Sequence, residues 1–155
     1  MLRFISYDIV FQEIPGEVSL AINISNCPNI CVGCHSPHLQ DDIGEVLNEH
    51  VITELIHRYG SAVTCVCFMG GDGNPGEIEQ LAHFVKHFTN GQLKTAWYSG
   101  KICFPPECNY NNFDYIKLGP YIKEYGALNI PTTNQKFYQI VDECMVDVTE
   151  RFWKN

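Results

Sequence analysis

Three cysteines lie within one eight-residue window of the chain, at Cys27, Cys31 and Cys34. Thiolate sulfur binds zinc and iron–sulfur clusters, and three thiolates are one short of the four that complete a structural zinc site. Three close thiolates therefore suit a [4Fe–4S] cluster with one iron left without a protein ligand, where a substrate or cofactor can bind. Two alternatives stay open: a zinc site completed by His35 or His38, and cysteines that only pack.

The other five cysteines are dispersed, at Cys65, Cys67, Cys103, Cys108 and Cys144. In a secreted protein this number would indicate disulfides, but residues 1–10 do not resemble a signal peptide. Cys65 and Cys67 are expected on opposite faces of a buried strand, where they serve as packing groups. Cys103 and Cys108 lie in a proline-rich loop, and whether they bind a second metal stays open.

Composition and charge narrow the class of protein. The 155 residues are 45 % apolar and 12 % aromatic, which is typical of one globular domain over residues 1–155. The net charge is −8 and the chain has no basic run, so we expect no nucleic-acid partner. No apolar stretch approaches the roughly 18–20 residues that span a bilayer. We therefore expect a cytoplasmic protein with no membrane partner.

The hydrophobic pattern alternates between strand and helix periodicity. Strands are predicted over residues 4–11, 18–24, 63–69, 94–98 and 113–118, with a C-terminal hairpin over 137–141 and 145–149 that turns at 142–143. Helices are predicted over residues 45–59 and 77–88. This order favours βαβ units, an α/β fold and a mostly parallel sheet.

Three unusual loops follow predicted strands of this sheet. They are the cysteine window, the glycine-rich segment 70–76 (GGDGNPG) and the segment 98–100 (YSG). In parallel sheets the loops at the carboxyl ends of the strands form the working sites. We therefore expect these three loops to converge on one edge of the sheet.

The C-x₃-C-x₂-C spacing of the cysteine window resembles the signature of radical S-adenosylmethionine (SAM) enzymes. The pair Cys34-His35 resembles that of glycyl-radical activating enzymes. Gly33 stands where most of the superfamily has an aromatic residue, which is similar to the activators of anaerobic ribonucleoside-triphosphate reductase. The short chain and the segments 131–135 (PTTNQ) and 146–153 (VDVTERFW) fit the same family.

The resemblance also implies which residues bind SAM. Gly70, Gly71 and Asp72 resemble the GGE motif that holds the amino group of SAM, with the shorter Asp in place of Glu. The two glycines would let a ligand approach the backbone, and whether the Asp72 carboxylate itself contacts SAM stays open. The other implied SAM contacts are Gly33, Cys34, His35 (through its backbone), Tyr98 and Ser99.

The resemblance implies an open partial (βα) barrel of the radical SAM type with a mostly parallel sheet, because the chain is too short for a full barrel of about 250 residues. A [4Fe–4S] cluster on the three window cysteines would receive an electron from a donor such as flavodoxin or ferredoxin. SAM would then be cleaved to a 5′-deoxyadenosyl radical, which removes a hydrogen atom from a glycine of the reductase catalytic subunit. No side chain needs to act as a general acid or base, so no catalytic residue is predicted.

Three other functions stay open on the sequence. The chain could activate another glycyl-radical enzyme, or act as a different small radical SAM enzyme. It could also be a zinc-binding interaction module without catalysis. The sequence leaves open the electron donor, the oligomeric state and the protein that carries the target glycine.

Overall fold

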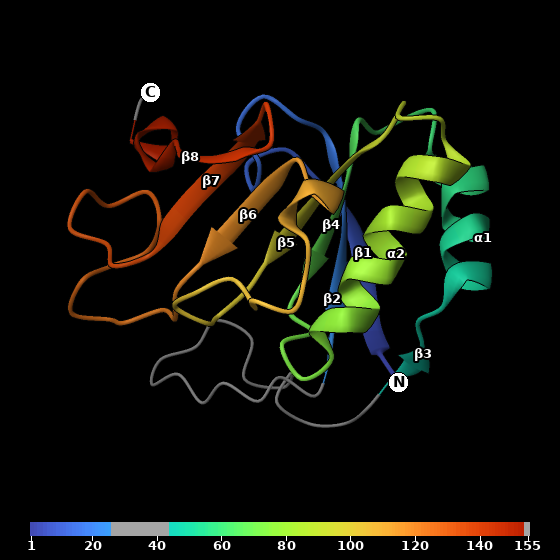
Figure 1. Ribbon diagram of the computed structural model, residues 1–155, viewed down its shortest axis with the longest axis horizontal. Helices are drawn as coiled ribbons and strands as arrows, with labels where there is room; N and C mark the ends of the chain where they lie inside the picture. Colours follow the sequence, from blue (N-terminus) through green and yellow to red (C-terminus); the bar gives the residue numbers. More distant parts are fainter. Residues whose placement is uncertain (26–43, 154–155) are drawn as a thin grey trace.

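The computed structural model describes residues 1–25 and 44–153. Within these ranges the chain forms one eight-stranded sheet and two α-helices (Figure 1). The strands are β1 (Arg3–Val10), β2 (Ser19–Ile24), β3 (Glu45–Val46), β4 (Cys65–Met69), β5 (Lys94–Tyr98), β6 (Tyr115–Leu118), β7 (Lys136–Val141) and β8 (Cys144–Asp147). The α-helices are α1 (Glu49–Tyr59) and α2 (Pro75–Phe88), and short 3₁₀ turns cover Tyr110–Asn112 and Thr149–Phe152.

The sheet has the order β3-β1-β2-β4-β5-β6-β7-β8. Its centre is parallel, because β2 pairs with β4, β4 with β5 and β5 with β6 in the same direction. The flanks are antiparallel, with β1 between β3 and β2 on one side and β7 between β6 and β8 on the other. The α/β class is therefore confirmed, but the sheet is mixed rather than mostly parallel.

Two antiparallel pairs of the flanks, β1–β2 and β7–β8, are joined by short connections without a helix. Parallel neighbours need a crossover of a dozen or more residues, whereas a tight turn joins only antiparallel strands. β7 and β8 are joined by Asp142 and Glu143, which adopt φ values of 49° and 65°. A turn also joins β1 to β2 at Gly16 (φ 85°). The predicted C-terminal hairpin and the position of its turn are both confirmed.

The first helix begins later than its hydrophobic pattern predicts. Glu45–Val46 pair with β1 as β3, and α1 begins only at Glu49. Asn48 has extended backbone angles, and its side chain accepts a hydrogen bond from the Val51 amide at 3.0 Å. An asparagine in this position caps a helix N-terminus, because it satisfies one of the otherwise unpaired amides of the first turn.

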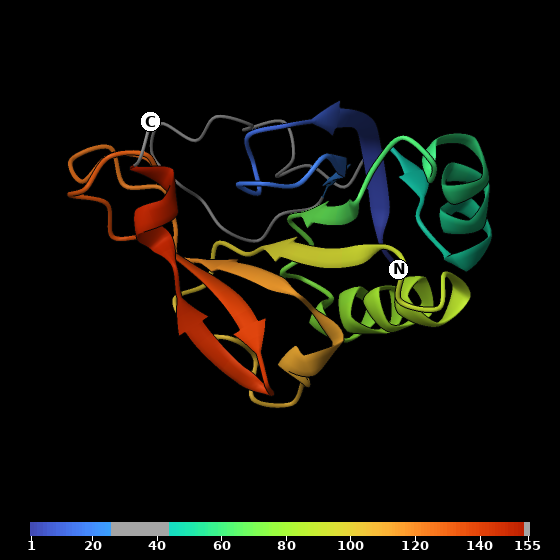
Figure 2. The same cartoon turned by 90° about the horizontal axis from the view of Figure 1, so that it is seen from above.

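Alternating residues of the central strands build two separate cores. Ile22, Phe68 and Trp97 pack with α1 and α2 on one face of the sheet. Tyr115 and Phe137 pack on the other face, beneath Ile14, Phe152 and their neighbours. Figure 2 shows both α-helices together on one side of the sheet. The loop over residues 11–18 and the C-terminal 3₁₀ turn therefore cover the face that carries no α-helix.

The two cysteines of β4 lie on the same face of the sheet. Cys65 and Cys67 are fully buried and both join the core on the helix-free face. The expectation that they face opposite sides is wrong, because residues two apart in a strand share a face. Burial raises the pKa of the Cys65 thiol to about 12 and that of Cys67 well above its usual range. Both are therefore neutral packing groups.

Neither α-helix in the described ranges has the length and apolar character that a membrane-spanning helix requires.

Candidate functional site at the carboxyl ends of the strands

The predicted site residues divide into two sets. Gly33, Cys34, His35, Cys27 and Cys31 lie outside the described residues, so their predicted roles stay predictions. Gly70, Gly71, Asp72, Tyr98 and Ser99 are described, at the carboxyl ends of β4 and β5. The described chain also leaves β2 at this edge, because β2 runs parallel to β4 and ends at Ile24.

The loop after β4 is bonded directly to the end of β5. The Gly70 amide donates to the Tyr98 carbonyl at 3.0 Å. In the opposite direction, the Trp97 indole Nε1–H donates to the Gly70 carbonyl at 2.7 Å. These two bonds fix the path of the glycine-rich loop where it leaves the sheet.

The first two glycines of this loop, Gly70 and Gly71, have backbone angles that other residues rarely adopt. Gly70 has a φ of 104° and Gly71 a φ of 88°, in the left-handed region that favours glycine. A Cβ at Gly71 would lie 2.5 Å from Ile78 Cδ1 of α2, and a Cβ at Gly70 would lie 3.1 Å from the Ile24 carbonyl oxygen. The glycines therefore let the loop pass between the end of β2 and the first turns of α2.

The Asp72 carboxylate joins the loop after β4 to the loop after β5. Its side chain is buried, with 9 % of the residue exposed. Oδ1 accepts a hydrogen bond from Ser99 Oγ at 2.5 Å, and Oδ2 accepts one from the Gly100 amide at 2.8 Å. Ser99 Oγ accepts in turn from the Lys101 amide at 3.1 Å. Two of the predicted site residues, Asp72 and Ser99, therefore belong to one hydrogen-bonded unit with Gly100 and Lys101.

A lysine that was not predicted extends this unit to β6. The buried Lys117 ammonium donates to the Ser99 carbonyl at 3.1 Å and to the Gly119 carbonyl at 3.0 Å. The Gln135 side chain also donates to the Gly119 carbonyl, at 3.4 Å. Lys117 thus positions the loops after β5 and β6 relative to each other. Lys117 could have been found from the sequence, because it is a charged residue within the otherwise apolar strand YIKL.

Tyr98 packs against the core on the helix-free face of the sheet. Its hydroxyl donates to the Glu13 carbonyl, so it holds the loop over residues 11–18. The Lys117 ammonium lies 5.6 Å from the centroid of its ring, within the range of a cation–π contact. Burial raises the pKa of Tyr98 well above its usual range, which keeps the phenol neutral. The Tyr98 hydroxyl could donate to SAM only by giving up its bond to the Glu13 carbonyl.

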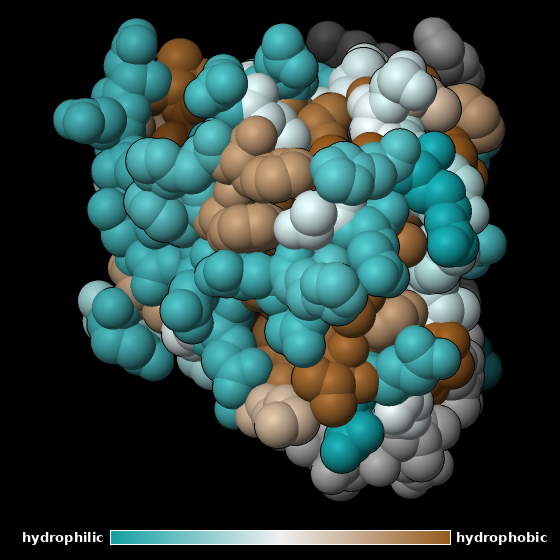
Figure 3. Space-filling view, turned by 90° about the vertical axis from the view of Figure 1, so that its right-hand side faces the viewer, coloured by the Kyte–Doolittle hydropathy of each residue, from teal (hydrophilic) through white to brown (hydrophobic). Residues whose placement is uncertain are grey.

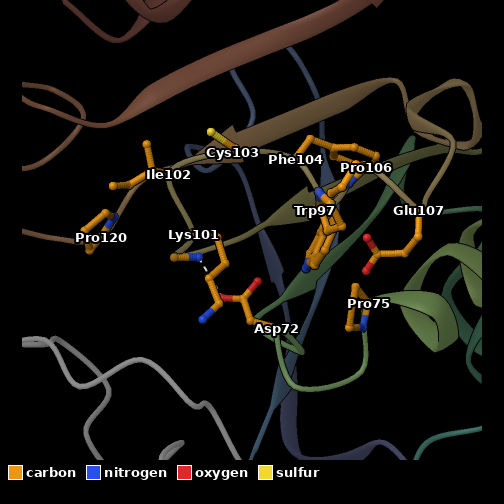
Figure 4. Close-up of a pocket in the computed structure, with 12 residues that line it drawn as sticks. Asp72, Pro75, Trp97, Lys101, Ile102, Cys103, Phe104, Pro106, Glu107 and Pro120 are labelled. Carbon is orange, nitrogen blue, oxygen red and sulfur yellow. Dashed lines mark hydrogen bonds between the residues drawn. The ribbon is translucent and has the colours of Figure 1, made fainter.

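An open groove adjoins the Asp72 carboxylate (Figure 4). Its volume is about 690 Å³, within the range of small-molecule sites. The half-buried Phe104 ring supplies apolar surface and packs against the Trp97 ring, which is only 1 % exposed, while Lys101 and Glu107 add one charge of each sign. The walls come from the loops after β4, β5 and β6, which are the loops that Asp72 and Lys117 hold together. The groove therefore offers apolar surface beside a fixed carboxylate.

The cysteines of the loop after β5 are poor candidates for a metal site. Cys103 is exposed and lines the groove, whereas Cys108 is partly buried. Burial and the nearby carboxylates of Glu79 and Glu107 raise the pKa of Cys108 to about 11. The thiolate is the form that binds metals, so this environment disfavours it. In residues 1–25 and 44–153, no group of three or more His, Cys, Asp or Glu side chains could hold a metal ion.

Comparison of the chain with protein-family models, with curated proteins and with solved structures finds no match. The sequence motifs and the geometry of the strand ends are therefore the basis for assigning a function.

Proposed function

We propose that this chain is a radical SAM activating enzyme that installs a glycyl radical on a partner protein. In this proposal Cys27, Cys31 and Cys34 hold a [4Fe–4S] cluster, and the partner is the catalytic subunit of anaerobic ribonucleoside-triphosphate reductase. The main support is the pair of hydrogen bonds from Ser99 and Gly100 to the Asp72 carboxylate. They join two loops that resemble SAM-binding segments, at the sheet edge where β2 leads toward the cysteine window.

The groove and the residues beside it fit the chemistry of SAM. The cluster and SAM, when bound, supply the one-electron cleavage that yields a 5′-deoxyadenosyl radical. Asp72 places negative charge beside the groove, where it would attract the ammonium group of SAM. The Phe104 ring, which packs against the buried Trp97, would offer an apolar surface to the nucleoside and exclude water from it.

The proposed fold is the open partial barrel of this superfamily. Its support is the parallel centre β2-β4-β5-β6, together with α1 and α2 on one face of the sheet. The antiparallel strands β1, β3, β7 and β8 would then extend the barrel on both sides. The parallel strands are the part that this proposal requires, because their carboxyl ends carry the loops that bind SAM.

A protein substrate suits the open side of the groove. Ile102 is 79 % exposed at its edge, and Lys101 and Cys103 beside it are also exposed. An exposed isoleucine at the edge of a site is a residue that a docking protein would cover. A loop of the partner that carries the target glycine would enter from this side, and would exclude water as it docks.

The proposal is tested with anaerobically reconstituted protein, SAM, a chemical reductant and the reductase catalytic subunit. We expect a brown protein and a glycyl radical on the reductase by electron paramagnetic resonance. Cys31→Ala should abolish both cluster absorption and the radical. Cys144→Ala, which changes an exposed cysteine of β8, is the matched control and should change neither.

Three other outcomes would contradict parts of the proposal. Colourless protein with stoichiometric zinc would indicate the interaction module. SAM cleavage without a radical on the reductase would indicate a different substrate. Reduction by a chemical reagent but by neither flavodoxin nor ferredoxin would contradict the proposed class of electron donor.

A further inference from the structure

The solvent-facing side of α2 carries two histidines one helical turn apart. His83 and His87 are both exposed, and their ring centroids are 4.1 Å apart with an angle of 49° between the ring planes. Figure 3 shows that the helix-covered side of the molecule is mostly hydrophilic. Residues at i and i+4 lie on the same helix face, and this spacing lets two imidazoles bind one metal ion.

A chain of hydrogen bonds determines which nitrogen of His83 carries the proton. Glu79 Oε2 accepts from the Asn109 amide at 2.7 Å and from Asn112 Nδ2 at 2.9 Å. A carboxylate only accepts hydrogen bonds, so the amide nitrogen of Asn112 must face Glu79 and its Oδ1 must face His83. His83 Nδ1 lies 3.1 Å from that oxygen and must therefore be the donor. In the neutral ring, the lone pair is then on Nε2.

We propose that His83 and His87 bind one divalent transition-metal ion, with His83 ligating through Nε2. Imidazole nitrogen is a preferred ligand of Zn²⁺, Cu²⁺ and Ni²⁺. Histidines that bind metals usually donate their other ring N–H to an oxygen, which fixes the tautomer and orients the ring. Asn112, itself held by Glu79, already provides that oxygen for His83. The orientation and tautomer of the His83 ring are therefore already set in the metal-free protein.

The surroundings of the pair tolerate a cation. The nearest helical lysine, Lys86, pairs with Asp114 at 3.2 Å, which offsets its charge. Glu79 lies one turn before His83 and adds a negative charge to the same face. Within the described ranges, no set of three or more ligating side chains could hold a metal. Water must therefore fill the remaining positions, and we expect the ion to exchange readily.

The pair is separate from the groove at the strand ends. The groove touches α2 at Pro75, and His83 lies eight residues further along the helix, about 12 Å away along its axis. The inference therefore does not depend on the proposed radical chemistry. It would hold equally if the cysteine window bound zinc.

The test is a titration with Ni²⁺ alone, followed residue by residue by NMR, because thiols elsewhere in the chain can also bind nickel. We expect paramagnetic broadening of the amide signals of residues 79–90 and of both imidazoles. His87→Gln should raise the nickel concentration needed for this broadening by about tenfold or more, since the second ligand of a chelate is lost. The matched control is His50→Gln, an exposed helical histidine whose i+4 neighbour is Glu54, and it should behave as the wild type.

A change at Asn112 tests the hydrogen bond that orients the His83 ring. Asn112→Leu should weaken nickel binding at α2 by about tenfold, because the His83 ring loses the acceptor that orients it. Thermal melting of each variant verifies that the fold is kept. Equal nickel dependence in wild type and His87→Gln would overturn the inference. An Nε2-protonated His83 in the metal-free protein, read from imidazole ¹⁵N shifts, would overturn the assigned ligand atom.

Discussion

Two buried carboxylates lie at opposite ends of the central strands. Glu17 and Asp72 are each 9 % exposed, yet their partners differ. Glu17 accepts from the Lys94 ammonium, the Tyr115 hydroxyl and the Thr64 hydroxyl, each at 2.7 Å.

Asp72 accepts from Ser99 and from the Gly100 amide, beside an open groove. The amino-terminal edge is thus closed by side chains from three strand starts. The carboxyl-terminal edge is held mainly by loop donors and stays open to a ligand. The comparison separates a carboxylate that stabilises the sheet from one that, in our proposal, is placed for binding at the carboxyl ends of the strands.

The glycine-rich loop should show the largest effect on stability. Gly71→Ala would place a Cβ 2.5 Å from Ile78 in a backbone with a φ of 88°. We expect a loss of about 2–3 kcal/mol in the free energy of unfolding, from strain and overpacking together. Chemical denaturation measures it. The matched control is Gly76→Ala in α2, where a Cβ meets no atom within 4 Å and should stabilise the helix slightly. Equal effects of both changes would show that Gly71 is not constrained.

Removal of the Glu17 carboxylate, at the amino-terminal edge of the central strands, should lower stability without changing SAM affinity. Glu17→Ala leaves the Tyr115 hydroxyl and the Lys94 ammonium without their acceptor, and we expect a loss of about 2 kcal/mol. SAM affinity, measured by equilibrium dialysis, should stay at the wild-type value. Glu54→Ala removes an exposed glutamate paired with His50 and serves as the control, with an effect under about 0.5 kcal/mol. A fall in SAM affinity for Glu17→Ala would remove the distinction between the two edges.

For Asp72, at the carboxyl-terminal edge of the central strands, we expect the converse: a substitution should lower SAM affinity. Asp72→Asn keeps an acceptor for Ser99 but turns an NH₂ group toward the Gly100 amide or toward the groove. We expect SAM affinity to fall about tenfold, which corresponds to about 1.4 kcal/mol. Ser99→Ala is informative beside it, because it removes the donor but leaves the carboxylate. If Asp72→Asn binds SAM as the wild type does, the carboxylate only connects the two loops.

The smallest effect concerns pH. Burial alone would raise the pKa of Glu17, but the hydrogen bonds from Lys94, Thr64 and Tyr115 outweigh it and hold the pKa below its usual value. A carboxyl with a lowered pKa contributes stability above its unfolded pKa, about 4.3, and loses it as pH falls through the folded pKa. Wild-type stability should therefore fall more steeply below pH of about 4.3 than that of Glu17→Gln. Parallel curves for the two proteins would contradict the lowered pKa.

Local patterns predicted the elements whose signals are contained in a few neighbouring residues. The strand over 94–98 has the predicted bounds, and the turn at 142–143 lies where it was expected. The helix over 45–59 was predicted four residues too long at its start, because the apolar pattern continues through Leu47 while the Asn48 cap determines the true start. Apolar periodicity thus located the helix but not its first residue.

Contacts between distant segments were not predictable from such patterns. Glu17 meets Lys94 and Tyr115 across 77 and 98 residues of chain, and Lys117 meets Ser99 across 18. The strand-end position of the loops after β4 and β5 was predicted correctly, because parallel strands bring their carboxyl ends to one edge. Which side chains bridge those loops depends on register, which appears only when the sheet is assembled.

The bonds from Ser99 and Gly100 to Asp72 have an entropic consequence for ligand binding. They order two loops before any ligand arrives, so a ligand that enters beside them does not bear the loss of conformational freedom of those loops. A preorganised wall of this kind favours affinity through slow dissociation rather than through fast association.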